Sequence, residues 1–245
     1  MRTGLCTVRG IALRAASRKN LNMFSSETTK GERTRERIRA TALRSFRERG
    51  YDDTTVRLIA REAGVSLGST NYHFPSKNHL VQELYLEVTG DFRATATERM
   101  ADATDLVERL RIAYLTGLEV LGPYHDFGPG FLAAAVSPRS PINPLSGESE
   151  PALGEAVAVF RDAIDGSTRH GIPADLVDEL PEALTVGYLL LALFWTYDRS
   201  PSQERTRRLL SGALRLIAPA LPLLRVPAIR RPVRELLALI GEVRA

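Results

Sequence analysis

The chain has 245 residues and a net charge of +4; 44% of its residues are hydrophobic and 25% charged, which excludes a wholly disordered protein and allows a sizeable core. The single cysteine, Cys6, excludes an internal disulfide and a metal site built on cysteines. The longest apolar run, Tyr188 to Trp195, is far shorter than the roughly 20 residues of a membrane-spanning helix, so we interpret it as buried helix and expect no membrane partner.

The charge is distributed unevenly along the chain. Residues 1–29 hold five basic residues and one acidic residue, residues 30–80 hold eleven and six, and residues 81–245 hold seventeen and twenty-two. A basic front on an acidic body indicates a polyanionic partner for the front alone. A solvated charged face is the alternative that composition leaves open.

Residues 1–31 form a basic N-terminal extension that we exclude from the fold. Three interpretations fit it: a disordered basic arm, an upstream extension of a protein whose natural start is Met23, and an organelle transit peptide, whose composition it shares. The segment that follows favours the first two.

A helical pattern begins at Thr34, where apolar residues recur at helical spacing, and Gly50 ends it. A second helix follows, because Thr54 and Thr55 can each accept a hydrogen bond from its first turn. Gly64 closes this second helix. Two helices are therefore expected before residue 65, the first ended by Gly50 and the second by Gly64.

Ser66 can cap a third, short helix, which Pro75 limits. Ser76 can cap a fourth helix that runs towards Met100. No alternating strand pattern of useful length follows, so the predicted fold class is all-α, with a three-helix head and a helical body. Further helices are predicted at 105–121, 127–136, 150–170, 179–198 and 202–218, with an amphipathic C-terminal helix at 225–245.

The apolar stripe of the segment 225–245 has two interpretations. Arginines flank the stripe, so it can lie on a membrane surface. Packing on the body of the same chain is favoured, because such stripes are usually part of a core.

The second and third helices meet at Ala63, Gly64 and Val65. A helix-turn-helix needs a tight turn at this place, and glycine permits the left-handed backbone that such a turn contains. The third helix, at about 66–73, would then enter the major groove of DNA by its N-terminal end.

With these residues the sequence resembles the TetR family of transcriptional regulators over about residues 32–92. The resemblance rests on a long combination rather than on the glycine alone. Its parts are Phe46, Gly50-Tyr51, Thr54-Thr55, Ile59-Ala60, Ala63-Gly64-Val65-Ser66 and His73-Phe74-Pro75-Ser76-Lys77.

The resemblance implies a DNA-binding domain at 32–92, with the helix-turn-helix at about 55–74, and a helical ligand-binding and dimerisation domain at 93–224. It also implies a cytoplasmic homodimeric repressor that binds a palindromic operator in double-stranded DNA and is released by a small-molecule inducer. The fourth helix would couple the two domains. A ligand-dependent activator and a helical ligand-binding or enzymatic protein that has lost DNA binding stay open as alternatives.

Several side chains of the head are expected to contact DNA. Asn71 suits adenine, whose N6 and N7 match an amide. Arg57 suits a phosphate or a base but can be merely solvated, and Tyr72 can instead be a core aromatic. The expected contacts are Thr55, Arg57, Ser66, Leu67, Ser69, Thr70, Asn71, Tyr72, His73 and Lys77.

The body is expected to hold an apolar ligand cavity lined by aromatic residues, although core packing of the same residues is the alternative. His125, Asp126, Asp162 and His170 lack metal-ligand spacing, so we expect no metal and no cofactor. The segment 66–70 lacks the Gly-x-Ser-x-Gly context of a nucleophile, so we also expect no catalytic residue. The candidate ligand-binding residues are Tyr114, Phe131, Phe160, Tyr188 and Trp195.

The helices at 179–198 and 202–218 are expected to form a four-helix interface with their symmetry mates. A two-fold pair would supply the two heads that a palindrome requires. The predicted interface carries Leu180, Leu184, Tyr188, Leu191 and Trp195 on the first helix, and Leu209, Leu210, Ala213, Leu216 and Ile217 on the second.

Overall fold

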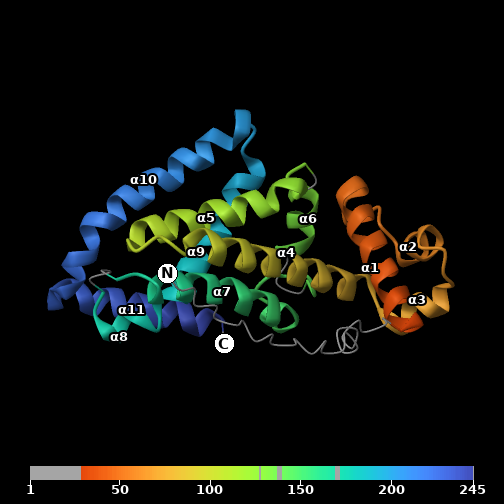
Figure 1. The fold of residues 1–245 in the computed structure, drawn as a ribbon, viewed down its shortest axis with the longest axis horizontal. Helices are drawn as coiled ribbons and strands as arrows, with labels where there is room; N and C mark the ends of the chain where they lie inside the picture. The colour runs from red at the N-terminus through yellow and green to blue at the C-terminus, as the bar shows by residue number, and fades with distance from the viewer. Residues whose placement is uncertain (1–28, 127, 137–139, 169–171, 245) are drawn as a thin grey trace, which may run out of the picture.

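The computed structural model describes residues 29–126, 128–136, 140–168 and 172–244, and within these residues every regular element is a helix. The all-α prediction is therefore confirmed, while residues 1–28 of the expected extension lie outside the described part. Figure 1 shows three helices gathered at one end, which we call the head, and a larger helical body reached through α4. The head contains α1 (Lys30–Arg49), α2 (Val56–Glu62) and α3 (Leu67–His73), and α4 spans Lys77–Met100.

The body contains the remaining helices, and short 3-10 turns join several of them. Its helices are α5 (Leu106–Leu121), α6 (Gly128–Ala135), α7 (Glu150–Asp165), α8 (Ala174–Val177), α9 (Leu180–Tyr197), α10 (Glu204–Ala220) and α11 (Pro227–Arg244). Its turns are η1 (Gly122–Tyr124), η2 (Gly147–Ser149), η3 (Pro201–Gln203) and η4 (Leu221–Arg225).

The head has a small core, which α4 and two residues of the body, Ala135 and Ile142, complete. Phe46 from α1, Ile59 from α2 and Phe74 after α3 are almost completely buried against one another. Helix α1 begins four residues before the expected Thr34, because Thr29 and Glu32 form a reciprocal capping box. It ends at Gly50, whose φ of +80° lies in the region that favours glycine.

Helix α4 belongs to both parts of the molecule. Leu80 and Leu84 in its first half pack in the head core, whereas Phe92 and Met100 in its second half pack in the body core. One continuous helix therefore contributes side chains to both cores.

A buried arginine joins the ends of α4 and α7. The guanidinium of Arg109 donates to the carbonyl oxygens of Met100 and Ala103 at the end of α4, and to those of Asp162 and Ala163 on α7, at 2.7–2.8 Å. Carbonyls at a helix end lack intrahelical partners and carry partial negative charge, so they satisfy the cation without a carboxylate.

The predicted helices at 105–121, 127–136, 179–198 and 202–218 are confirmed within two residues at each end. The helix predicted at 150–170 is longer than the observed α7, which ends at Asp165. Gly166 follows it, and a Cβ at this position would lie 2.1 Å from Arg109 Nη2. Helix α8 was not predicted, since four residues are too few for a periodic pattern.

Helix α9 is long and apolar enough, by length and composition alone, to cross a membrane, but a third of it is buried inside the chain. Residues 201–225 and 227–241 are long and apolar enough to cross a membrane only if they are taken together, and a bend of 113° separates the two segments. Val233 and Leu237 of α11 pack against the body core, whereas Val226 and Leu236 of the C-terminal segment are exposed, so the packing interpretation of the stripe holds only in part.

Candidate DNA-binding site

A tight turn fixes α3 across α2. Gly64 has φ +64°, a left-handed conformation that is costly for residues with a Cβ. Val65 N donates to Ala60 O at 3.0 Å, so the turn is bonded back to α2. Ser66 Oγ then accepts from Ser69 N at 3.0 Å and starts α3. The predicted turn and both predicted serine caps, Ser66 and Ser76, are confirmed.

One face of α3 points away from the head core. Tyr72 is 84% exposed, so its alternative as a core aromatic is wrong. Its ring lies edge-on to His73 with the ring centroids 5.1 Å apart. Leu67 and Asn71 are also exposed, while Ser69 is partly covered. An exposed tyrosine with few rotatable bonds and a hydroxyl is well suited to contact a phosphate backbone.

Thr70 is the exception among the ten expected DNA contacts. Its side chain is completely buried, and its hydroxyl donates to Ser66 O at 3.1 Å. Residues on a helix turn by about 100° each, so Thr70 faces inward while Asn71 and Tyr72 face outward. We therefore leave Thr70 out of the candidate site.

Lys77 is placed by Tyr51. Its Nζ donates to Tyr51 O at 2.8 Å and lies 3.7 Å from the centroid of the Tyr51 ring. Burial lowers the pKa of Lys77, and the nearby carboxylate of Asp52 opposes that shift. The ammonium group is thus held at the start of α4, beside main-chain amides that favour anions.

Helix α2 contributes two exposed arginines. Thr55 caps the helix through a bond from Leu58 N at 3.1 Å, and Arg57 follows in its first turn. Arg61 lies four residues after Arg57 and is exposed as well, so both guanidinium groups share one side of α2. Arg61 is not among the contacts expected from the sequence, although its position four residues after Arg57 already indicates a shared side of the helix.

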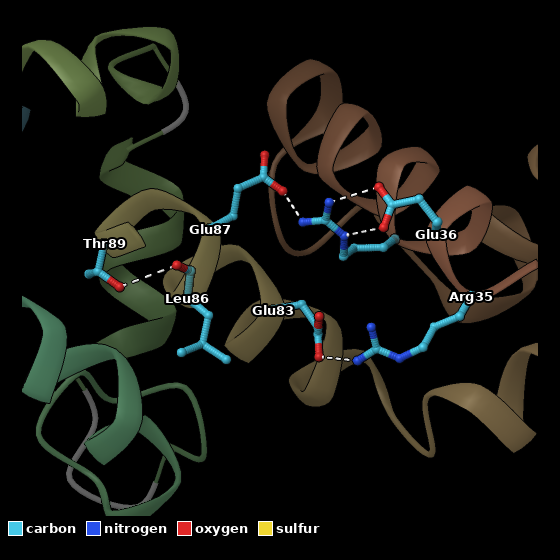
Figure 2. Close-up of polar contacts among 7 residues, drawn as sticks. Arg35, Glu36, Glu83, Leu86, Glu87 and Thr89 are labelled. Atoms are coloured by element: carbon cyan, nitrogen blue, oxygen red, sulfur yellow. Dashed lines mark hydrogen bonds and ion pairs between the residues drawn. The ribbon is translucent and has the colours of Figure 1, made fainter. Parts of the chain in front are cut away.

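Two ion pairs connect α1 to α4 (Figure 2). Arg35 Nη2 lies 2.5 Å from Glu83 Oε1, and Arg39 pairs with Glu87 one turn further along both helices. Arg39 also holds Glu36 on its own helix at 2.7 Å. Because 35 and 39, like 83 and 87, are four apart, the two pairs bridge the helices side by side.

The five expected ligand-binding residues do not come together. Tyr114, Phe160, Tyr188 and Trp195 share the body core, and the rings of Tyr114 and Phe160 lie 4.9 Å apart. Phe131 instead packs beside the head core, where its ring contacts those of Tyr51 and Tyr85. The core-packing alternative therefore describes most of these aromatics.

The exposed apolar face of α9 differs from the expected interface, while that of α10 agrees with it in part. Tyr188, Leu191 and Trp195 are buried in the chain's own core, as is Leu210. A helix this rich in apolar residues has a second apolar stripe on its opposite side. On α9 the exposed apolar residues are instead Leu190, Leu193, Phe194 and Tyr197, whereas on α10 the predicted interface residues Leu209, Ala213 and Leu216 are exposed as expected.

Metal-ligating side chains do not cluster in the described ranges: no three His, Cys, Asp or Glu residues there lie close enough to hold an ion. His125 bonds through Nε2 to Trp195 O at 3.1 Å, and Asp126 is its nearest carboxylate, at 3.8 Å. His170 lies outside the described residues.

Two family models match the chain. The model described as "Bacterial regulatory proteins, tetR family" matches residues 38–84, and the model described as "Tetracyclin repressor-like, C-terminal domain" matches residues 109–235. Together they cover the head from residue 38 onward, most of the body and part of α11.

Individual proteins extend this similarity. An uncharacterized HTH-type transcriptional regulator of Mycobacterium tuberculosis (strain ATCC 25618 / H37Rv) is 38% identical over 63 residues, which are 26% of this chain and 30% of that relative, so the match spans less than a third of the relative's length. HTH-type transcriptional regulator LmrA of Bacillus subtilis is 28% identical over 165 residues, 65% of this chain and 86% of LmrA.

A solved structure shares the fold. FadR of Thermus thermophilus, a TetR-family transcriptional repressor determined in complex with lauroyl-CoA, superposes with a TM-score of 0.56 at 22% identity. The superposition covers 75% of this chain and 93% of FadR.

Proposed function

Because the chain belongs to the tetR family of bacterial regulatory proteins, we propose that this transcriptional regulator is a cytoplasmic homodimeric repressor that binds a near-palindromic operator and leaves it when a small molecule binds the body. The observation that carries the proposal is the outward face of α3, which a left-handed glycine turn holds in place. This face presents an exposed amide, Asn71, beside an exposed aromatic hydroxyl, Tyr72.

Different side chains of the head contact the bases and the phosphates of the DNA. Asn71 on α3 reads a base edge in the major groove, and Leu67 contacts a thymine methyl group. Tyr72, Arg57 and Arg61 contact phosphates and set the register of the head on the duplex. The remaining expected contacts lie at or near the ends of α2, α3 and α4 and donate hydrogen bonds to the DNA backbone. They are Thr55, Ser66, Ser69, His73 and Lys77.

Dimerisation supplies the second head. The exposed apolar stripes of α9 and α10 pack against the same stripes of a second copy, in a two-fold interface of four helices. Such contiguous apolar surface is typical of an interaction site rather than of a monomer's exterior. Burial in the dimer also accounts for the apolar face that α9 leaves uncovered in one chain.

The body responds to a small molecule and α4 carries the response. The ligand-bound FadR of Thermus thermophilus, which shares this fold, supports a ligand-binding role for the body. A ligand that favours one arrangement of the α4–body contacts shifts the separation of the two heads. A coupling of about 1–3 kcal/mol would weaken operator binding by roughly 5- to 150-fold.

The test uses fluorescence anisotropy with duplex DNA taken from upstream of the chain's own gene and with a shuffled duplex of the same composition. We expect the upstream duplex to bind two chains, with an affinity that falls steeply with salt. Tyr72→Ala and Arg61→Gln should each weaken binding, and Arg61→Gln should lower the salt slope by about 1. Arg231→Gln, an exposed arginine of α11, is the matched control.

The outcome also separates the forms of regulation. In transcription reactions from the upstream promoter, a repressor lowers the transcript level and an activator raises it. Equal affinity for the upstream and shuffled duplexes, with Tyr72→Ala unchanged, would contradict sequence-specific binding by this face of α3.

A further inference from the structure

A cavity of about 240 Å3 lies where the end of α5, the end of α9 and the start of α10 meet. Its apolar walls are formed by Leu118 and Trp195, which are almost completely buried. The other residues that line it are partly or fully exposed. The cavity therefore has an apolar interior and a polar mouth. Its lining residues are Leu118, Glu119, Gly122, Trp195, Gln203 and Arg207.

One charged group at the mouth of the cavity, the guanidinium of Arg207, is available to bind an anionic ligand. The carboxylate of Glu119 is 2.6 Å from Arg99 Nη1, so its charge is compensated within the chain. Arg207 Nε donates to Ser202 O at 3.2 Å, and the described part of the chain places no carboxylate within ion-pair distance of this guanidinium. Its two terminal nitrogens suit a carboxylate, which they can bind with two parallel hydrogen bonds.

The turn that presents Arg207 is strained. Ser202 and Gln203 have φ of 50° and 51°, and they are the sole non-glycine residues with positive φ in the described part of the chain. The buried Asp198 carboxylate holds the turn from both sides, accepting from the amide and hydroxyl of Ser200 and of Thr206 at 2.6–2.9 Å. Strained backbone that its surroundings enforce is typical of ligand clamps.

We propose that this cavity binds a small aromatic carboxylate, with its ring against Leu118 and Trp195 and its carboxylate on Arg207. A cavity of about 150 Å3 accommodates benzene, so this volume leaves room for a ring, a short stem and a carboxylate. Phenylacetate has this size and chemistry. The effect of this ligand on DNA binding rests on the proposed function, whereas the binding of the ligand does not.

The cavity is connected to the head by one short segment. Gly122 lines the cavity and begins η1, and two residues later the Tyr124 ring lies 5.5 Å from the guanidinium carbon of Arg47 on α1. His125 then contacts the cavity wall again, because its ring centroid lies 4.6 Å from that of Trp195. A ligand that prefers one arrangement of this segment biases the position of α1.

The cavity and the proposed dimer interface lie on different sides of α10. Arg207 precedes Leu209 by two residues, a rotation of about 200° around a helix. Leu209 and Leu216 belong to the exposed apolar stripe, so a partner chain packed on that stripe leaves Arg207 accessible. The site is complete within one chain.

The binding test uses the full chain, its single tryptophan and phenylacetate as the probe. Trp195 is the only tryptophan and lines the cavity, so its fluorescence reports occupancy at this place. We expect a saturable change in wild type and an affinity lower by roughly tenfold or more for Arg207→Gln and for the neutral amide, phenylacetamide. Arg208→Gln, next along α10 and paired with Glu204, should bind like wild type.

Three results would overturn the site: no saturation of wild type by millimolar phenylacetate, equal binding by Arg207→Gln, or equal binding of the amide. Operator DNA is then titrated with and without phenylacetate. If the ligand binds through Arg207 but leaves operator affinity unchanged, the connection to the head is wrong and the site stands. If the chain binds no operator at all, the proposed function fails while the tryptophan titration still decides the site.

Discussion

Arg35 on α1 and Glu83 on α4 form an ion pair 2.5 Å long, and Arg39 and Glu87 repeat it one turn further along both helices. The head is thereby fastened to the helix that continues into the body. All four side chains are partly exposed, so water and salt screen them, and the pairs orient the head more than they stabilise it.

Replacing both carboxylates, Glu83→Gln with Glu87→Gln, should lower the free energy of unfolding by about 1 kcal/mol, because each partly exposed pair contributes about 0.2–1 kcal/mol. It should also reduce the effect of an inducer on operator affinity, since α1 then follows α4 less closely. Urea denaturation and anisotropy measure the two effects. Glu204→Gln breaks an exposed pair within α10 and should leave inducer response unchanged; an unchanged response in the double variant contradicts the role given to α4.

Two glycine substitutions should have opposite signs. Gly64→Ala places a Cβ on a residue with φ +64° and should destabilise the protein by about 1–2 kcal/mol. Gly90→Ala lies on an exposed face of α4, where the new Cβ meets nothing, and should stabilise by about 0.5–1 kcal/mol. Thermal unfolding of both variants measures these stability changes. A Gly64→Ala variant that is more stable than wild type would contradict a left-handed turn.

Local signals in the sequence predicted most of the head. Gly50 and Gly64 end helices because of their own conformational freedom, and Ser66 and Ser76 start helices through bonds to residues three positions on. These interactions lie within one turn of chain, so they can be read without knowing the fold.

Long-range relationships could not be read in this way. Arg109 binds carbonyls of two helices that only the fold brings together, and nothing in its neighbourhood along the sequence marks it as buried. Trp195 and Phe194 illustrate a second limit. Apolar residues surround α9 on more than one side, so spacing alone could not say that Trp195 faces the core and Phe194 faces outward.

The stability contributed by Asp198 should depend on pH. Burial by itself raises the pKa of Asp198, but the hydrogen bonds from Ser200 and Thr206 outweigh it and hold the pKa well below its ordinary value. A lowered pKa stabilises the folded chain fully above the pKa of an unfolded aspartate, about 3.9, and this contribution is lost as the pH falls further towards the folded value.

Asp198→Asn should therefore cost about 1–3 kcal/mol at neutral pH, since one acceptor oxygen becomes an amide donor. The difference from wild type should shrink below about pH 4. Urea denaturation from neutral to acidic pH measures the difference in unfolding free energy, and the exposed Asp102→Asn is the control. A difference that stays constant from neutral to acidic pH shows that the carboxylate charge does not hold the turn.

A charge placed in the exposed stripe of α9 should separate the dimer. Leu190 is 61% exposed in the single chain, and in the proposed interface Leu190→Glu buries a carboxylate without a partner. We expect wild type to sediment as a dimer at micromolar concentration and this variant as a monomer with weaker operator binding. Leu239→Glu on α11, 58% exposed, is the matched control; a dimer that tolerates Leu190→Glu but not Leu239→Glu places the interface elsewhere.

Hydroxyl-radical footprinting of the wild-type protein on an operator selected from random duplexes tests the central claim most directly. A dimer that places α3 of each chain in the major groove should protect two patches related by a two-fold axis. Their centres should lie about 10–10.5 base pairs, or a multiple of that spacing, apart on one face of the duplex. A single protected patch, or selection that yields no common sequence, would contradict a dimeric regulator that reads DNA with this helix.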